Sequence, residues 1–170
     1  MVNVIAELLI RCGAIEFGEF TLASGAKSKY YVDIKTAATN PEILKPIGDA
    51  IAATADFDVV AGVAVGAVPI AVAVSLSARK PYAIIRRDEK GHGKSGNIIG
   101  DVEGKEVLLV EDVTTTGGSV LYGIRCLQDA GARIRQVITV VDREEGAEAT
   151  LRDLGIELTA LVKASDILTQ

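Results

Sequence analysis

From residue 59 onward the chain is dominated by short apolar runs that alternate with helical patterns. Five runs rich in β-branched residues fall at 59–61, 82–85, 107–110, 137–141 and, more weakly, 157–162. Apolar residues at helical spacing lie between them at about 68–77, 119–130 and 147–154. Strands that alternate with helices in this way predict an α/β fold, with a mostly parallel, doubly wound sheet and flanking helices.

The first 40 residues follow a different pattern. After a short helical pattern, two extended pieces at 19–22 and 30–34 enclose a turn-rich segment. They predict a small antiparallel hood, mainly within residues 1–40, before a helix that begins at Asn40-Pro41. We expect the whole chain to form a single domain, with its core at about 41–170.

Composition and charge exclude several classes of function. The formal net charge of −5 would repel a nucleic-acid backbone, so we expect no nucleic-acid partner and a local cluster around any bound anion. Residues 59–78 nearly reach the length of a membrane span, but glycines and a proline divide them, so no membrane association is expected. Because Cys12 and Cys126 stand far apart and no signal-peptide pattern is evident, we expect a cytoplasmic protein with free thiols.

A polar or glycine-rich segment follows each of the first four apolar runs. These segments are 62–66, 86–87, 111–119 and 142–144. In open parallel sheets, ligands bind beyond the carboxyl ends of the strands. We therefore expect the four segments to converge at one edge of the sheet and to form the functional site there.

The third segment carries the strongest chemical signal. Glu111 and Asp112 end an apolar run, and a turn of threonines and glycines at 114–118 leads through Ser119 into a helical pattern. Successive backbone N–H groups in such a turn, backed by a helix N-terminus, form a nest for a phosphate, and the hydroxyl groups can add hydrogen bonds. Two adjacent carboxylates would repel that phosphate but suit the vicinal hydroxyls of a ribose. The alternative is an ordinary helix cap with two solvated acids.

The sequence of residues 107–119, VLLVEDVTTTGGS, closely resembles the phosphoribosyl pyrophosphate signature of type I phosphoribosyltransferases. This resemblance implies the type I phosphoribosyltransferase fold, with residues 114–119 around the 5′-phosphate and the two acids on the ribose 2′- and 3′-hydroxyls. The residues that it assigns to the cosubstrate are Glu111, Asp112, Val113, Thr114, Thr115, Thr116, Gly117, Gly118 and Ser119. The motif is specific for the fold and the cosubstrate, but it does not choose the base.

The second segment opens a glycine-rich loop, residues 86–96, that holds four cations and the only histidine. Its glycines match a dinucleotide-binding spacing, but no helical pattern follows, which disfavours that interpretation. A lid over an anionic substrate fits better, with a solvated charged loop as the alternative. Orotate phosphoribosyltransferases carry such a lid, and the resemblance assigns Arg86, Arg87, Lys90 and His92 to cosubstrate contacts. In that family the lid closes over the pyrophosphate of the neighbouring subunit, which implies a homodimer.

The fourth segment and the hood bear on the base. Residues 142–146 resemble the stretch of the orotate enzymes whose arginine contacts the pyrimidine, here Arg143, and a guanidinium suits the carboxylate of orotate. Residues 20–33 are similar to the hood of that family, which implies that Tyr31 lies near the pyrimidine; Thr115 is a further implied substrate contact. A surface ion-pair cluster and simple hood packing of the tyrosines are the alternatives.

Two positions depart from the family pattern. Ala23 stands where many members have a lysine that contacts substrate, and residues 62–66 lack a lysine found in many bacterial members. Binding of pyrophosphate by residues 62–66 would therefore rest on backbone N–H groups.

The resemblance implies an enzyme of de novo UMP synthesis that joins orotate to the ribose of phosphoribosyl pyrophosphate, giving orotidine 5′-phosphate and pyrophosphate. Its implied catalytic residues are Arg87, Lys90, His92 and Asp112. Mg²⁺ is the expected cofactor, held mainly by substrate and water rather than by protein ligands. A purine acceptor on the same fold, and a nucleotide sensor that regulates transcription, remain as alternatives.

Overall fold

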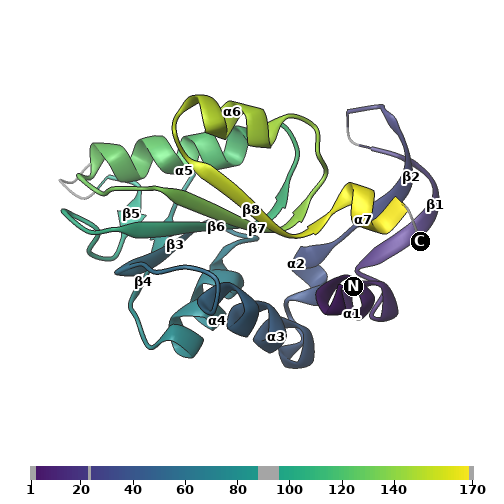
Figure 1. The fold of residues 1–170 in the computed structure, drawn as a ribbon, viewed down its shortest axis with the longest axis horizontal. Coiled ribbons are helices and arrows are strands. Elements are labelled where there is room, and N and C mark those ends of the chain that lie inside the picture. The colour runs from purple at the N-terminus through teal and green to yellow at the C-terminus, as the bar shows by residue number, and fades with distance from the viewer. Residues whose placement is uncertain (1–2, 23, 88–95, 169–170) are drawn as a thin grey trace.

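The computed structural model describes residues 3–22, 24–87 and 96–168 (Figure 1). Its centre is a six-stranded sheet in the order β5-β4-β3-β6-β7-β8. The strands are β3 (Val59–Val63), β4 (Tyr82–Ile85), β5 (Ile98–Ile99), β6 (Val107–Thr114), β7 (Gln136–Asp142) and β8 (Glu157–Lys163). Neighbouring strands are parallel, except that β5 pairs antiparallel with β4 at one edge. The predicted fold class, α/β with a mostly parallel sheet, is confirmed.

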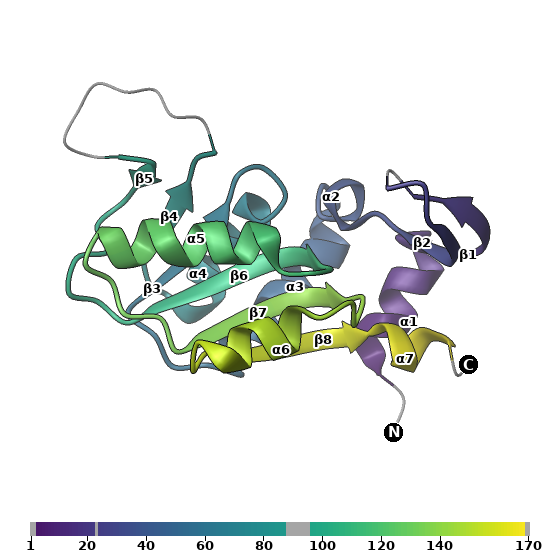
Figure 2. The ribbon, with the colours of Figure 1, turned by 90° about the horizontal axis from the view of Figure 1, so that it is seen from above.

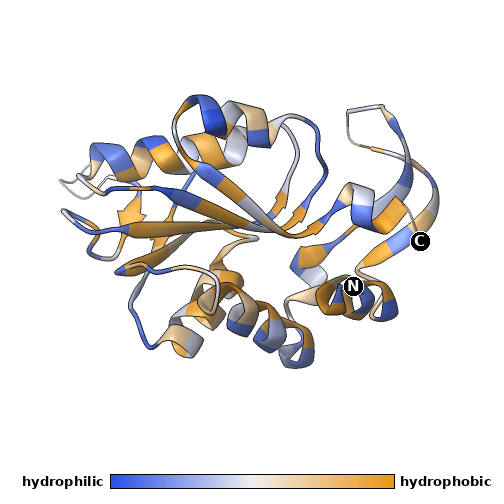
Figure 3. Ribbon diagram, viewed as in Figure 1, coloured by the Kyte–Doolittle hydropathy of each residue, from blue (hydrophilic) through white to orange (hydrophobic). Residues whose placement is uncertain are grey.

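Helices cover both faces of this sheet (Figure 1). α3 (Pro41–Ala52) and α4 (Val68–Ala78) lie on one face, and α5 (Gly118–Asp129) and α6 (Ala147–Asp153) lie on the other. Successive residues of β6 alternate between two halves of the core, since Leu108 and Val110 pack on the α3–α4 side and Leu109 on the α5–α6 side. Because both faces are buried, the strands read as continuous apolar runs. Figure 3 shows these apolar strands enclosed between helices of mixed polarity.

The hood lies beside the sheet and has its own two-stranded antiparallel sheet. Its elements are α1 (Val4–Arg11), β1 (Ile15–Thr21), β2 (Lys27–Val32) and α2 (Ile34–Ala37). Both strands begin earlier than predicted: β1 begins at Ile15, which pairs with Val32, and β2 begins at Lys27, which pairs with Thr21. β2 also ends earlier, since the Asp33 side chain accepts hydrogen bonds from the backbone N–H and the hydroxyl of Thr36 and thereby begins α2.

The hood contacts the core through α1, which packs against α3 and β8. The side-chain nitrogen of Asn3, which caps α1, donates a hydrogen bond to the Leu161 carbonyl oxygen of β8 at 2.6 Å. The short α7 (Ala164–Leu168) continues from β8 on the same side. In Figure 2 the arrowheads of β7 and β8 point toward the hood, with α1 and α7 beside it. The hood therefore stands beyond the carboxyl ends of these strands.

β6 extends past the apolar run predicted at 107–110. Val113 pairs with Val141 and Thr114 with Asp142, so the strand continues through both acids to residue 114. Glu111 and Asp112 are consequently held by the sheet and not by the loop that follows it. The prediction ended at Val110 because charged residues normally mark the exposed end of a strand.

The apolar stretch at 59–78 forms β3, a turn and α4, as its glycines and proline predict. Within the part of the chain that the structure describes, no helix has the length and apolar character needed to cross a membrane. Cys12 is exposed and Cys126 is half-buried, and both thiols are free.

Candidate active site

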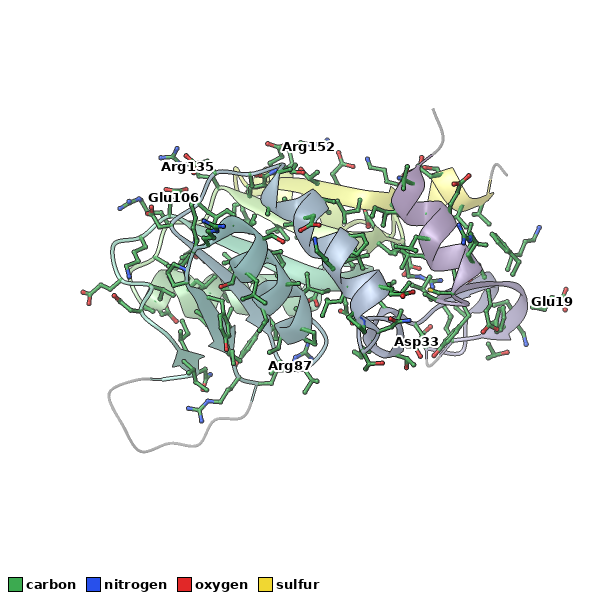
Figure 4. All side chains as sticks on the ribbon, turned by 90° about the horizontal axis from the view of Figure 1, so that it is seen from below. Glu19, Asp33, Arg87, Glu106, Arg135 and Arg152 are labelled. Carbon is green, nitrogen blue, oxygen red and sulfur yellow. The ribbon has the colours of Figure 1, made fainter. Side chains whose placement is uncertain are left out.

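A cavity of about 700 Å³ opens where the core meets the hood. Its lining consists of hood residues 31–35, residues 63–66 after β3, Arg87 after β4, residues 111–113 with Thr115 and Ser119, and Arg143 after β7. In Figure 4, Arg87 and Asp33 lie on one side of the molecule, away from Glu106 and Arg135, which precede β6 and β7. All four segments that follow the strands therefore contribute to one cavity at the carboxyl edge of the sheet.

Two buried carboxyl groups stand at the centre of this cavity. Glu111 is 4% exposed and Asp112 is 8% exposed. One carboxyl oxygen of Glu111 accepts a hydrogen bond from the Asp112 backbone N–H at 3.0 Å, and the other, Oε2, is buried without a hydrogen-bond partner among the described residues. Burial raises the pKa of Glu111 to about 8, and the adjacent Asp112 raises it further in the same direction. The cavity wall therefore carries a buried acceptor oxygen without a partner among the described residues and, beside it, the Asp112 carboxyl group.

The turn after β6 provides backbone donors for an anion. Gly117 has a φ of +93°, a left-handed conformation that favours glycine, and it caps the N-terminus of α5. The backbone N–H groups of residues 115–119 have no acceptor within the described chain. Ser119, in the first turn of α5, accepts a hydrogen bond from the Arg87 guanidinium. Free N–H groups, a helix N-terminus and an arginine together form a site for a phosphate.

Thr114 has a different role from the one that the motif implies. It is the last residue of β6, it is 2% exposed, and its hydroxyl donates a hydrogen bond to Asp142 at 3.0 Å. Because the side chain faces the interior between β6 and β7, its hydroxyl is not available to the phosphate. The anion site consequently begins at residue 115.

Arg143 joins the core to the hood. Its Nε donates to Glu145 at 2.9 Å, and a terminal nitrogen donates to the Ser28 hydroxyl at 3.3 Å. Its guanidinium carbon lies 4.6 Å from the centroid of the Tyr30 ring, and only 9% of its side chain is exposed. The next residue on β2, Tyr31, is 46% exposed and lines the cavity. A fixed guanidinium beside an exposed aromatic ring is suited to a planar ligand with a carboxylate.

Comparisons with known proteins agree with this geometry. Residues 33–154 match the model of the phosphoribosyl transferase domain family. A protein of Methanoculleus marisnigri named orotate phosphoribosyltransferase is 64% identical over 168 residues, which cover 99% of each chain. The chain belongs to the orotate phosphoribosyltransferase family.

Two solved structures of this family share the fold. The orotate phosphoribosyltransferase of Aeropyrum pernix gives a TM-score of 0.86 at 31% identity and covers 98% of this chain and 97% of its own. The Mycobacterium tuberculosis orotate phosphoribosyltransferase in complex with phosphoribosyl pyrophosphate gives a TM-score of 0.78 at 31% identity, with 97% of each chain covered.

The structure brings most of the predicted site residues of this family member to the cavity. Those that line it are Tyr31, Arg87, Glu111, Asp112, Val113, Thr115, Ser119 and Arg143. Thr116, Gly117 and Gly118 form the turn beside it without lining it. The Arg86 guanidinium donates instead to the Gly96 carbonyl oxygen at 3.3 Å. Lys90 and His92, which were predicted to contact the cosubstrate, lie outside the residues that the structure describes, and so does Ala23.

Two site residues were not predicted. The Tyr30 ring contacts the Arg143 guanidinium, whereas the sequence motif indicated Tyr31. Lys35 lines the cavity from α2. The available signal for Lys35 was its place two residues after the hood motif, but only the docking of α2 against the core turns that position toward the site.

Proposed function

We propose that this chain transfers the 5-phosphoribosyl group of phosphoribosyl pyrophosphate to orotate, forming orotidine 5′-phosphate and pyrophosphate in UMP biosynthesis. One observation carries the proposal: a phosphate nest, a buried acid pair and a fixed arginine beside an aromatic ring share a single cavity. These groups match the phosphate, the diol and the carboxylated base of the two substrates. The name of its relatives and the bound cosubstrate of the Mycobacterium tuberculosis enzyme support the same reaction.

In this function the segments that follow the strands bind different groups of the two substrates. Backbone N–H groups of 115–119 bind the 5′-phosphate, and Glu111 and Asp112 accept hydrogen bonds from the ribose hydroxyls. Arg143 donates to the carboxylate of orotate, and Tyr31 covers the face of the pyrimidine. Because these anchors come from β6, the N-terminus of α5, the end of β7 and β2 of the hood, which pack around one cavity, the ring nitrogen of orotate is aligned with ribose C1.

The chemical step breaks the bond between C1 and pyrophosphate while the pyrimidine nitrogen forms its bond to C1. Positive charge on the ribose and negative charge on the departing pyrophosphate develop together. Buried Asp112 lies on the ribose side, and Arg87 lies where the pyrophosphate leaves. Lys90 and His92 would add donors from the lid, and closure of that lid would exclude water from the cationic centre.

The acid pair also fits a role beside Mg²⁺. The unpaired buried oxygen of Glu111 and the carboxylate of Asp112 are hard oxygen acceptors of the kind that this ion prefers, directly or through water. Over the described residues, no three acidic, histidine or cysteine side chains converge as a metal cage. We therefore assign the ion mainly to substrate oxygens and water, with Glu111 and Asp112 behind them. Its chemistry there is the neutralisation of pyrophosphate charge.

We further propose a homodimer in the cytoplasm in which the lid, residues 86–96, closes over the site of the neighbouring subunit. Two impaired variants, assayed at orotate concentrations well below saturation, test this arrangement: Lys90→Ala impairs the lid and Arg143→Ala impairs the base site. If the lid acts across the interface, a mixed dimer has one site with both parts intact, and activity returns on co-expression. If each lid serves its own subunit, co-expression restores nothing.

The reaction itself is tested by the loss of orotate absorbance with phosphoribosyl pyrophosphate and Mg²⁺, and again with EDTA. We expect turnover that stops when the metal is chelated. Turnover of adenine, guanine or xanthine in place of orotate would assign the cavity to a purine. Binding of the cosubstrate without turnover of any base would favour a sensor.

A further inference from the structure

Three cationic side chains among the described residues line the cavity, and one of them is unpaired. Arg87 donates to Ser119, and Arg143 is held by Glu145, Ser28 and the Tyr30 ring. Lys35 forms no hydrogen bond or ion pair with any residue that the structure describes. An ammonium group with three donors therefore faces the cavity and is available to a ligand.

The position of Lys35 is fixed by the residues before and after it. Ile34 is 1% exposed and anchors α2 in the core. The Asp33 carboxylate accepts hydrogen bonds from the backbone N–H and hydroxyl of Thr36, and these bonds first, with the positive charge of Lys35 after them, lower the pKa of Asp33. Figure 2 shows α2 on the side of the hood that faces the six-stranded sheet, and α2 contacts β6 of that sheet.

The Lys35 side chain crosses the loop that follows β3. A Cβ built on Gly66 would lie 2.9 Å from Lys35 Cε and also close to the Asp112 carboxylate. The lysine therefore runs over the α-carbon of Gly66, beside the carboxylate that faces the ribose in the proposed function. Only a glycine leaves space for this crossing.

The same loop presents two backbone donors. The N–H groups of Val65 and Gly66 have no acceptor in the described part of the chain, whereas that of Ala64 donates to Ile85. Residues 62–66 contain no charged side chain. A multiply charged anion bound over these N–H groups needs a cation from elsewhere, and among the residues that the structure describes Lys35 approaches this loop at Gly66.

The order of the strands indicates which anion this is. β3 and β4 lie on one side of β6, and β7 lies on the other. The base site at Arg143 follows β7, whereas Gly66 and Arg87 follow β3 and β4. The base and the leaving group lie on opposite sides of ribose C1. The leaving group must therefore lie on the side of the acid pair that faces away from the base.

We propose that Lys35 binds the pyrophosphate group of phosphoribosyl pyrophosphate over the N–H groups of Val65 and Gly66 and stabilises its charge as it leaves. This inference rests on the proposed function. Lys35, on α2 of the hood, then supplies positive charge in place of the lysines that this chain lacks at position 23 and in residues 62–66. The same lysine holds the product pyrophosphate until it is released.

Lys35→Gln removes the charge at nearly unchanged length, Lys35→Arg keeps the charge, and Lys29→Gln is the matched control. Lys29 is exposed on β2 of the same hood and does not line the cavity. For Lys35→Gln we expect KM for phosphoribosyl pyrophosphate and the inhibition constant of inorganic pyrophosphate to rise about 10- to 100-fold. KM for orotate should stay within about twofold of wild type. Lys35→Arg should recover most of the loss, and Lys29→Gln should behave as wild type.

An unchanged pyrophosphate inhibition constant in Lys35→Gln would overturn the inference, as would a rise confined to KM for orotate. The thermal shift caused by inorganic pyrophosphate with Mg²⁺ separates this inference from the proposed reaction. If wild type did not turn over orotate, yet pyrophosphate stabilised wild type and not Lys35→Gln, the proposed reaction would fail and the lysine site would stand. If wild type turned over orotate and both proteins were stabilised equally, the reaction would stand and the lysine site would fail.

Discussion

Gly66 lines the cavity at a position that has no space for a side chain. A Cβ there would lie 2.3 Å from Asp112 Oδ2 and 2.9 Å from Lys35 Cε. Because non-bonded heavy atoms normally approach to roughly 3.5 Å, Gly66→Ala must displace the Asp112 carboxylate by about 1 Å. A displacement of about 1 Å near the reacting atoms costs about 100-fold in rate. We therefore expect kcat/KM for phosphoribosyl pyrophosphate to fall by that factor.

The matched control places the same methyl group in an equally tight position away from the site. A Cβ on Gly48 of α3 would lie 2.7 Å from Ala73 Cβ and 2.8 Å from the Ala73 carbonyl carbon of α4. Here backbone atoms obstruct the methyl group, so the helices must separate at a cost of about 1–3 kcal/mol. At Gly66 the obstructing atoms belong to two side chains, which can turn aside, so we expect a smaller loss of stability.

The assay measures initial rates over a range of cosubstrate at saturating orotate, together with urea unfolding of both variants. Gly66→Ala should lose activity and keep most of its stability. Gly48→Ala should lose stability but keep its activity at a temperature where it is folded. A folded Gly66→Ala that retains the wild-type kcat/KM would contradict this prediction. A Gly48→Ala that loses as much activity as Gly66→Ala would contradict it as well.

Three further predictions follow from the same contacts. Arg143→Ala should raise KM for orotate about 10- to 100-fold and leave KM for the cosubstrate unchanged, as steady-state kinetics would show; an effect on the cosubstrate alone would contradict the base site. Because the folded-state pKa of Glu111 is raised to about 8, its contribution to stability is full below about pH 4.5 and is lost as the pH rises through 8. The unfolding free energy of ligand-free wild type should therefore fall by a few kcal/mol between pH 5 and 9 relative to that of Glu111→Gln, and equal pH profiles for the two proteins would refute this. Thr114→Val should lower the unfolding free energy by about 1–3 kcal/mol, because Asp142 loses a buried donor; unchanged urea unfolding would argue against that hydrogen bond.

The sheet could be predicted because each long strand is marked by its own short stretch of sequence. Each of its long strands is buried on both faces, so a run of apolar residues marks it wherever it lies in the chain. The edge strand β5 has only two residues and depends on its pairing with β4, so its sequence carries no detectable pattern. The end of β6 was missed for the opposite reason: Glu111 and Asp112 are charged but buried, as residues at a functional site can be.

The same distinction explains which parts of the site could be predicted. The backbone donors of the proposed phosphate site are contiguous, since the turn and the first turn of α5 that carry them occupy residues 115–119. Arg143 was predicted from a motif, but its contact with Ser28 joins residues 115 positions apart. The crossing of Lys35 over Gly66 depends on how α2 docks between two sheets, and no local pattern records that arrangement.

In the proposed function the hood contributes to the binding of both substrates. Ser28 and Tyr30 contact Arg143, to which we assign the base, whereas Lys35 reaches Gly66, where we place the pyrophosphate. Both contributions depend on the same arrangement of the hood, in which Asn3 donates a hydrogen bond to Leu161 of β8 and the Asp33 N–H donates to Ala14, just before β1. A shift of the hood would therefore change the binding of both substrates together, whereas a change in one strand exit would affect a single substrate. In this way the fold couples two sites that the sequence presents as separate motifs.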